Sequence, residues 1–394
     1  MAKILYLAQL LPYPADAGPK VRIYHVLRHL AQRHEVTLLA FNRPDDPPQA
    51  KEHLRQFCAA VHTVPMVRSR SRDLRALLLS LLKGGSFIIQ RDESREMIQK
   101  VNQLLSEQTF DAVHADQLWM AQYALQARGI RRVLDEHNAC FQIFQRLAQG
   151  EKNPLKRIFL EWEWRRLKAY EMKTCARFDQ VVTVTEEDRR TLQSGSRPGP
   201  EYSVIPICID PEQTSPVTPH PGARDILHLG TMFWLPNVEG VLWFAQQVWP
   251  QVRSQVPGVT FTIIGKRPPE AVRALATAGG VRVTGYIADP RPFLEAAAAF
   301  VVPLHSGSGM RVKILDAWSW GLPVISTRTG AEGIRYIDGE NILIADTPEQ
   351  FAQAVVRVLC DPQLAQRLRE NGRRWVETQY NWRRVYETWN EIYP

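Results

Sequence analysis

The sequence predicts an α/β protein built from two doubly wound domains, and two observations carry this prediction. Short apolar segments alternate with amphipathic stretches almost throughout, which is typical of parallel sheets covered by helices. The chain has 394 residues, more than the roughly 250–300 at which a single hydrophobic core stops growing. Because ligands bind beyond the carboxyl ends of such strands, two facing Rossmann-like domains would form one deep ligand cleft.

The first domain is expected over residues 1–205. Its opening segment reads as a core strand and not as an export signal, since Gln9, Pro12 and Pro14 interrupt the apolar run. Helical periodicity follows between residues 21 and 30 and recurs between the later strands. The strands are expected at residues 3–8, 35–41, 62–66, 111–115, 132–136 and 180–184.

A proline-rich segment over residues 206–224 predicts a linker, because proline lacks an amide donor and disfavours helix before it. The second domain is expected over residues 225–375. Its strands are expected at residues 225–230, 259–265, 281–286, 299–304, 323–327 and 341–345.

The chain is expected to end in a helix over residues 376–394 that packs back on the first domain. Trp375, Trp382 and Trp389 recur every seven residues, which would place them on roughly one face of a helix. Packing into a core is a more common role for such a stripe than ligand binding.

Composition narrows the classes of protein further. The formal net charge of +8 suits an anionic partner, but the chain has no zinc-finger spacing, RNP signature or basic tail that would indicate nucleic-acid binding. The five cysteines are scattered, so neither a disulfide framework nor a zinc site is indicated. No apolar run approaches the ~20 residues that cross a bilayer, and we expect a cytoplasmic protein.

Residues 305–327, HSGSGMRVKILDAWSWGLPVIST, combine glycines with the start of a helix that follows a strand. Free amides at a helix start form an anion site, and Gly307 and Gly309 would allow close approach of a ligand. Arg311 and Lys313 add positive charge in the first turn, where an anion would favour them. Lys313 and Asp316 could equally form a simple surface pair on one helix face.

Motifs of other nucleotide-binding classes are absent from the sequence. The first strand leads into AQLLPYPADAG and not into GxGxxG, which argues against a dehydrogenase, and the chain has no Walker loop. Asp45 and Asp46 lie among prolines, so they do not form a metal-binding DxD motif at a strand end. We therefore expect no metal or other cofactor.

Residues 305–327 resemble the signature of family 4 glycosyltransferases, which reads GSGxRxKxLEAxxxGxPV in the bacterial branch. Fragments in the same order along the chain extend the resemblance over nearly its whole length. They are LPYPADAGPKVR (11–22), LDEHN (134–138), FDQVVTVTEEDR (178–189), LHLGTMFWLPNVEGVLWFAQQVWPQV (227–252), TIIGKRPP (262–269), VTGYIADPRPFL (283–294) and DGENILIADTPEQFAQAV (338–355).

The resemblance implies a GT-B fold and a retaining glycosyltransferase that uses a nucleotide-diphosphate sugar. Asp316 matches the residue that holds the donor ribose, while Lys313 and Arg311 match the groups that face the diphosphate. The resemblance assigns the backbone amides that contact the phosphates or the donor sugar to Ser308, Gly309 and Met310. It assigns the strand end and loop that bind the base to Gly285, Tyr286 and Ile287.

The resemblance also assigns residues of the first domain, which would bind the acceptor. Gly18, with Arg22 one turn later, matches the first strand–helix loop beside the diphosphate and the acceptor. His137 matches the histidine near the donor hexose; a lone histidine is more often structural, but its place at a strand end favours the site.

Two departures from the family pattern bear on the donor. The first of two family carboxylates is replaced by Ser308, and the second is Asp316 in place of glutamate. The basic residues that often follow the first strand of the second domain are replaced by residues 231–234, Thr-Met-Phe-Trp, so phosphate binding would depend more on Arg311 and Lys313.

The expected function is transfer of a hexose-type sugar from a UDP- or GDP-linked donor to a glycan or lipid-linked acceptor, in the synthesis of a cell-surface polysaccharide. A GT-B-like epimerase or phosphorylase, or a non-catalytic nucleotide-sugar-binding protein, is the alternative. Residues 67–83 and 156–166 pair basic with apolar residues. They indicate either peripheral contact with the anionic inner face of the plasma membrane or solvated helix faces with buried leucines.

Overall fold

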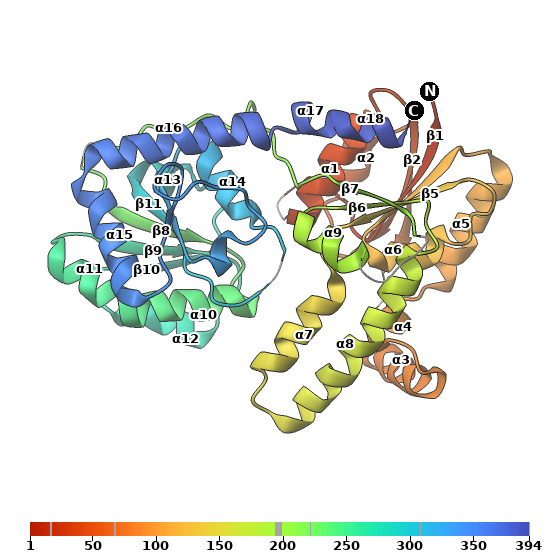
Figure 1. Ribbon diagram of the computed structural model, residues 1–394, viewed down its shortest axis with the longest axis horizontal. Coiled ribbons are helices and arrows are strands. Elements are labelled where there is room, and N and C mark those ends of the chain that lie inside the picture. Colours follow the sequence, from red (N-terminus) through yellow and green to blue (C-terminus); the bar gives the residue numbers. More distant parts are fainter. Residues whose placement is uncertain (16–17, 67, 194–198, 221, 308, 394) are drawn as a thin grey trace. The chain divides into compact units, whose positions relative to one another are not determined.

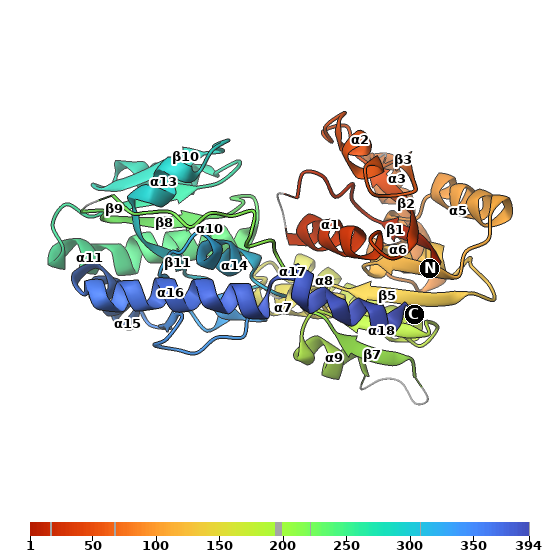
Figure 2. The same cartoon turned by 90° about the horizontal axis from the view of Figure 1, so that it is seen from above.

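The computed structural model describes residues 1–15, 18–66, 68–193, 199–220, 222–307 and 309–393. The chain divides into two units, of which unit 1 comprises residues 1–208 with 382–394 and unit 2 comprises residues 209–381. Each unit contains a single parallel sheet with helices packed on it, as expected from the alternation of apolar and amphipathic segments (Figures 1 and 2).

Unit 1 contains a seven-stranded parallel sheet of order β3-β2-β1-β4-β5-β6-β7. The six strands expected from the sequence are present with shifts of at most two residues at either end, and the short edge strand β7 was not expected. The strands are β1 Lys3–Ala8, β2 Glu35–Asn42, β3 Ala60–Pro65, β4 Ala112–Asp116, β5 Arg131–Glu136, β6 Gln180–Thr183 and β7 Glu201–Val204.

Alternation along the strands of unit 1 divides its core into two layers. In β1, Leu5 and Leu7 pack with α5, α6 and α8, whereas Ile4 and Tyr6 pack with α1, α2 and the C-terminal residues. The helices are α1 Gly18–Leu30, α2 Ala50–Arg55, α3 Arg70–Lys83, α4 Phe87–Arg91, α5 Arg95–Glu107, α6 Leu118–Ala124, α7 Cys140–Gly150, α8 Pro154–Cys175, α9 Glu186–Gln193, α17 Trp382–Val385 and α18 Trp389–Ile392.

Unit 2 contains a six-stranded parallel sheet of order β10-β9-β8-β11-β12-β13, and its strands match the six expected ones in number and order. Buried side chains of α10, α11 and α15 form one core layer with β8, β9 and β11. The strands are β8 Asp225–Leu229, β9 Thr260–Ile264, β10 Val281–Gly285, β11 Ala297–Val302, β12 Val324–Ser326 and β13 Leu343–Ile344. The helices are α10 Leu235–Trp243, α11 Trp249–Gln255, α12 Glu270–Arg273, α13 Arg291–Ala296, α14 Val312–Ser319, α15 Pro348–Cys360 and α16 Pro362–Gln379.

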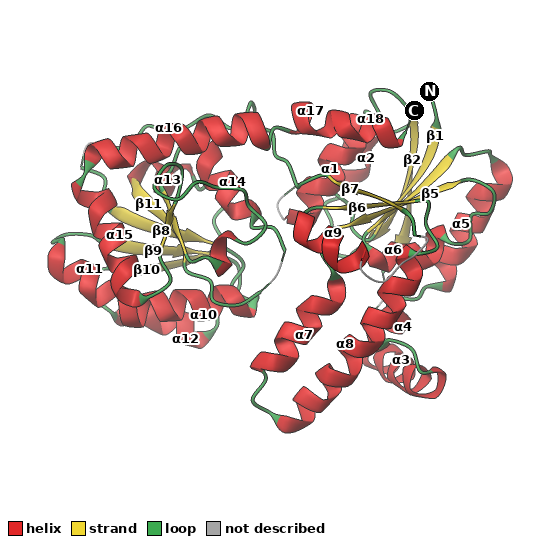
Figure 3. Ribbon diagram, viewed as in Figure 1, coloured by secondary structure: helices red, strands yellow, loops and turns green. Residues whose placement is uncertain are grey.

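The C-terminal segment corrects two expectations. It is not one helix over 376–394, because α16 ends at Gln379 and a new start follows at Trp382 (Figure 3). The three tryptophans therefore share no helix face. Trp382 and Trp389 are buried in the core of unit 1, whereas Trp375 belongs to unit 2 and donates to the Arg335 carbonyl.

The break in the C-terminal segment has a local cause in unit 2. Tyr380 leaves the helical conformation, and its carbonyl accepts from the Ile209 amide in place of a helical partner. Within the described ranges, no helix combines the length and apolar character that would be needed to cross a membrane.

Candidate functional site

The glycine-bearing segment lies between β11 and α14, at the carboxyl end of the sheet of unit 2. Gly307 and Gly309 have φ of 103° and 81°, a region that L side chains rarely adopt. A Cβ on Gly307 would lie 3.1 Å from the ring of Trp234. None of the described side chains caps the start of α14. No described side chain therefore competes with an anion for the amides at this helix start.

Arg311 shapes this loop from within. Its side chain is buried, and Nη1 donates to the Gly309 carbonyl at 2.8 Å. The guanidinium also lies 3.7 Å from the Glu332 carboxylate and over the ring of Trp234. Arg311 therefore both adds positive charge and holds the loop in its conformation.

Lys313 is held by a residue of α10 and lies next to the loop after β8. Its Nζ donates to Asn237 Oδ1 at 2.7 Å, and a Cβ on Gly230 would lie 2.8 Å from the same nitrogen. Burial, with a further contribution from the charge of Arg311, lowers the pKa of Lys313 to about 7. A bound anion would favour the charged form and raise this pKa again.

Asp316 lies one turn further along α14. Burial raises the pKa of its carboxyl group to about 7, and the charge of Lys313 opposes this shift. Both side chains are partly buried and Lys313 bonds to Asn237, so they are not the simple surface pair that spacing alone allowed. A partly buried carboxyl group in this position can accept hydrogen bonds from ligand hydroxyls.

The expected base-binding residues lie at the end of β10, two strands away from β8. Gly285 has φ of 75° and open space at the position of a Cβ, Tyr286 is exposed, and Ile287 is partly buried. Met310, at the α14 end of the site, packs against Gly333, whose Cβ would lie 2.9 Å from Met310 Cα. Ser308 lies outside the described residues.

Two basic residues at the end of β9 were missed in the sequence analysis. Lys266 and Arg267 are exposed, with Lys266 Nζ 4.6 Å from the ring of Tyr286 and the Arg267 guanidinium 6.0 Å from that of Phe233. The Lys266 carbonyl accepts from the Met232 amide, which connects this loop to the one after β8. The available signal was a Lys-Arg pair directly after an apolar strand. These residues place cationic charge where the loop after β8 has none.

In unit 1, Gly18 begins α1 and Arg22 follows one turn later. Arg22 is completely buried, with Nε and Nη2 on Asp135 and Nη1 on the carbonyls of Ile205 and Pro206. This corrects the expectation that Arg22 contacts the diphosphate or the acceptor: every nitrogen of its side chain already has a protein partner. Arg22 instead ties α1 to the end of β5.

His137 lies immediately after β5 and is nearly buried. Its Nε2 donates to Asp116 Oδ1 at 2.9 Å and lies 3.8 Å from Asp135 Oδ2. Burial raises the pKa of Asp116, which the charge of His137 opposes. Burial also opposes ionisation of Asp135, but the Arg22 charge prevails and lowers its pKa. The Nδ1 atom has no hydrogen-bond partner among the described residues.

Two groups of buried side chains could offer atoms to a metal ion. Asp116, Asp135 and His137 place ligand atoms within 4.8 Å of one another. A cation there would lie beside the guanidinium of Arg22, which already neutralises Asp135. Glu136, Cys140 and Glu171 form the second group, but both Glu171 oxygens already accept from the Cys140 and Phe141 amides at the start of α7.

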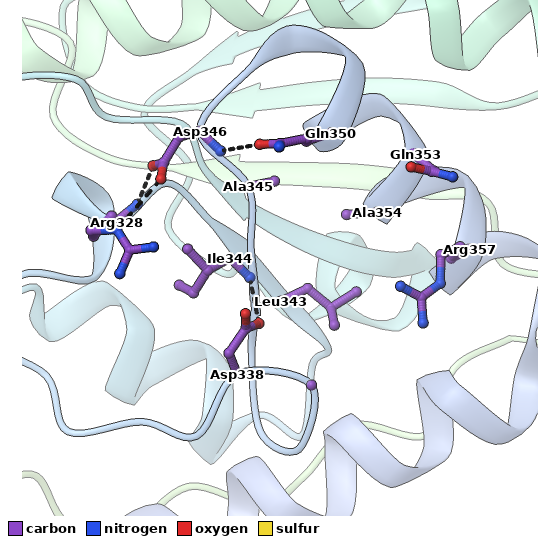
Figure 4. Close-up of a pocket in the computed structure, with 11 residues that line it drawn as sticks. Arg328, Asp338, Leu343, Ile344, Ala345, Asp346, Gln350, Gln353, Ala354 and Arg357 are labelled. Atoms are coloured by element: carbon purple, nitrogen blue, oxygen red, sulfur yellow. Dashed lines mark hydrogen bonds and ion pairs between the residues drawn. The ribbon is translucent and has the colours of Figure 1, made fainter.

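A separate open pocket of about 530 Å³ lies at the other edge of the sheet of unit 2 (Figure 4). Its Arg328 amide and Nε approach the carboxylate of Asp346, and the Asp338 carboxylate accepts from the Ile344 amide. None of the site residues expected from the sequence lines it. We therefore centre the candidate site on the start of α14 and not on this pocket.

Similar solved structures identify the fold of the protein. Sucrose-phosphate synthase from Thermosynechococcus elongatus matches with a TM-score of 0.70 and 15% identity, over 99% of this chain and 98% of that one. Anabaena HepE (Alr3699), crystallised with UDP and glucose, matches with a TM-score of 0.64 and 15% identity, over 100% and 99%. These matches show that the protein has the GT-B fold.

The family follows from the sequence match. Residues 17–213 match the description Glycosyltransferase Family 4, and residues 223–361 match Glycosyl transferases group 1. The chain belongs to glycosyltransferase family 4, as the resemblance of its motifs indicated.

Three relatives show how far similarity extends. A protein of Klebsiella pneumoniae described as an uncharacterized 44.6 kDa protein in the cps region is 23% identical, over 98% of this chain and 99% of its own length. The lipopolysaccharide core biosynthesis glycosyltransferase LpsE of Rhizobium meliloti is 35% identical over 32% and 39%. The GDP-mannose-dependent phosphatidylinositol monomannoside mannosyltransferase of Mycobacterium tuberculosis is 32% identical over 52% and 58%.

Proposed function

We propose that this glycosyltransferase is retaining and metal-independent, and that it moves a hexose-type sugar from a UDP- or GDP-linked donor to a glycan or lipid-linked acceptor. The observation that carries the proposal is the start of α14. There Arg311 and Lys313 follow two glycines with positive φ, and Asp316 lies one turn beyond. This arrangement offers cations and amides to a diphosphate and a carboxyl group to a ribose.

The chemistry of transfer fits this arrangement. As the glycosidic bond breaks, negative charge grows on the leaving diphosphate, and fixed donors at that position stabilise the transition state more than the ground state. Lys313 has a lowered pKa before the ligand binds, so it would gain a proton and full charge as the diphosphate arrives. For retention we propose a same-face substitution in which a donor phosphate oxygen takes the proton of the acceptor hydroxyl.

Metal independence is proposed on the same grounds. Arg311, Lys313 and the exposed Lys266 supply positive charge of the kind that Mg²⁺ supplies to diphosphates in other transferases. Asp116, Asp135 and His137 form an unfavourable site for a metal ion, because the positively charged guanidinium of Arg22 lies 2.6 Å from Asp135 and would repel the ion.

The pathway is proposed from the relatives. The description of LpsE names lipopolysaccharide core biosynthesis, and the Klebsiella protein is assigned to a cps region. These descriptions favour assembly of a cell-surface polysaccharide. The comparisons are compatible with either UDP or GDP as the nucleotide of the donor. HepE was crystallised with UDP, and the mycobacterial relative is described as GDP-mannose-dependent.

A thermal-shift screen of UDP-, GDP-, ADP- and dTDP-sugars with and without EDTA tests the donor and the metal. A ligand that binds only the folded state stabilises it, by about 2.7 kcal/mol at a hundredfold excess over Kd. We expect one nucleotide class to raise the melting temperature equally with and without EDTA. Loss of the shift with EDTA would contradict metal independence.

A second candidate is a non-catalytic nucleotide-sugar-binding protein, favoured by Ser308 at the position of a family carboxylate. A GT-B-like epimerase or phosphorylase is a third. Release of free nucleotide only when acceptor is present separates the transferase from both. The anomeric configuration of the product, measured by NMR, then tests retention.

A further inference from the structure

We propose that unit 1 binds the surface of an anionic lipid bilayer through exposed apolar side chains on α3 and at the tip of the α7–α8 hairpin. This lipid patch deepens the proposed function, because it would bring the enzyme to a lipid-linked acceptor. The residues of the patch are Leu74, Leu78, Leu81 and Leu82 on α3, and Leu155, Ile158 and Phe159 on α8.

The α3 helix has its apolar face outward. Its four exposed leucines follow the spacing i, i+4, i+7 and i+8, so they share one face. They are 53–83% exposed, whereas Ala76 and Ser80 are buried on the opposite side. The alternative that the leucines of this segment are buried is therefore wrong for these four. An outward leucine stripe on a helix loses its contact with water only when something apolar covers it.

The α8 helix contributes the second set of exposed apolar residues. The α7–α8 hairpin extends away from the sheet (Figure 3), and Leu155 and Ile158 near its tip are 77% and 66% exposed. Phe159 packs on Phe87 at the start of α4, with ring centroids 5.9 Å apart. Further along α8, Arg166 Nη1 donates to the Ser80 carbonyl of α3, so the two helices are joined.

Charge favours an anionic membrane as the occupant. Residues 68–83 contain five basic residues and one acidic residue. Arg70 and Arg75 on α3 and Lys156 and Arg157 on α8 are exposed next to the apolar stripe. Basic side chains flanking an apolar face are the pattern that binds anionic lipid headgroups. A symmetric pair of chains would instead bring these like charges together.

Within unit 1, the hairpin connects the patch to the segment that contains His137. The α7 helix begins at Cys140, three residues after His137, and its first amides are held by the buried carboxylate of Glu171 on α8. The hairpin is thus fixed to the end of β5, where His137 lies. A lipid surface bound at the hairpin would therefore be linked to His137 through α7.

Co-sedimentation of the full chain with vesicles tests the proposal without any donor, so its outcome is separate from that of the transferase assay. We expect the chain to bind vesicles of phosphatidylcholine with phosphatidylglycerol, and to bind vesicles of phosphatidylcholine alone far less. Neutralising two exposed charges, in R70Q/R75Q or K156Q/R157Q, should weaken binding about tenfold or more. Removing apolar contact, in L74Q/L78Q/L82Q or L155Q/I158Q, should also weaken it about tenfold or more.

Matched controls are I337Q and R367Q, which change an exposed apolar and an exposed basic residue of unit 2 and should bind like the wild type. Circular dichroism and the melting temperature check that the patch variants are folded. The proposal is wrong if the wild type binds neither vesicle or both equally, or if folded patch variants bind like the controls. It is equally overturned if the leucine changes convert a dimer into a monomer, which would assign the patch to a second copy of the chain.

Discussion

At the scale of single residues, Lys313 and Asp316 make the proposed donor site sensitive to pH, because burial brings both pKa values to about 7. Only protonated Lys313 attracts a diphosphate, and only ionised Asp316 is an acceptor for both ribose hydroxyls. Above pH 7 the charged fraction of the lysine falls about tenfold per pH unit, and below pH 7 the ionised fraction of the aspartate falls likewise. Since the two groups interact, the apparent pKa values belong to the pair.

We therefore expect the affinity for the donor nucleotide to be highest near pH 7 and to decline on both sides. K313R keeps its charge at all these pH values and should remove the alkaline decline, while D316N should remove the acid decline. Titration calorimetry with UDP and GDP from pH 5.5 to 9 measures both limbs. A flat profile in the wild type would show that neither group touches the nucleotide.

His137 presents the second prediction at this scale. H137A removes the hydrogen bond to Asp116 and the group expected near the donor sugar. We expect kcat to fall about a hundredfold, the loss that misplacing reacting groups by about 1 Å can cause, while the fold is kept. H137Q is the matched control, because its amide nitrogen lies about where Nε2 lies in histidine and can still donate to Asp116. A kcat of H137A equal to that of the wild type would show that His137 is not part of the site.

At the scale of elements, the conformation of the loop before α14 depends on a neighbouring turn. Gly333 has φ of 78°, and a Cβ there would lie 2.9 Å from Met310 Cα; Gly339 has φ of 80°, but a Cβ there would meet nothing within 4 Å. At either position alanine would have to adopt this left-handed backbone conformation, which destabilises the folded state by about 1–2 kcal/mol. Only G333A also displaces the backbone that carries the proposed phosphate amides.

We therefore expect both variants to lower the melting temperature, G333A by more because its Cβ also displaces Met310. Only G333A should weaken nucleotide binding, by about tenfold or more. Calorimetric Kd values and thermal melts on the same samples separate the two effects. Equal affinities in the two variants would show that the Met310 backbone plays no part in binding.

At the scale of the whole molecule, the two units carry different parts of the proposed function. Unit 2 contains the proposed donor site, and unit 1 contains His137 and the lipid patch. Hydrogen exchange measured by mass spectrometry can examine both in one chain, since local protection follows the segment that a ligand stabilises. UDP or GDP should slow exchange in residues 305–318, whereas anionic vesicles should slow it in residues 70–83 and 150–162. Protection of the same segments by both ligands would contradict this division.

Much of the fold was predictable because its signals are local. Strands β1 to β6 and β8 to β13 follow apolar segments that sequence periodicity reveals. Strand β7, Glu201–Val204, was missed because it is short, lies at the sheet edge and contains no buried residue to mark it. The prediction of one continuous helix over residues 376–394 is wrong, because a seven-residue tryptophan spacing also arises when two helices follow one another.

The sequence by itself determined the α/β class, the two-domain organisation and the cationic, glycine-bearing start of α14, because these depend on residue patterns within a few turns of chain. Only the tertiary structure decided which charged side chains are buried and which protein groups they bind. It buries Arg22 against Asp135, 113 residues away, and joins Lys313 to Asn237, 76 residues earlier. It also turns the leucines of α3 outward. Burial and pairing of this kind depend on which distant elements meet, and periodicity along one segment carries no information about its partners.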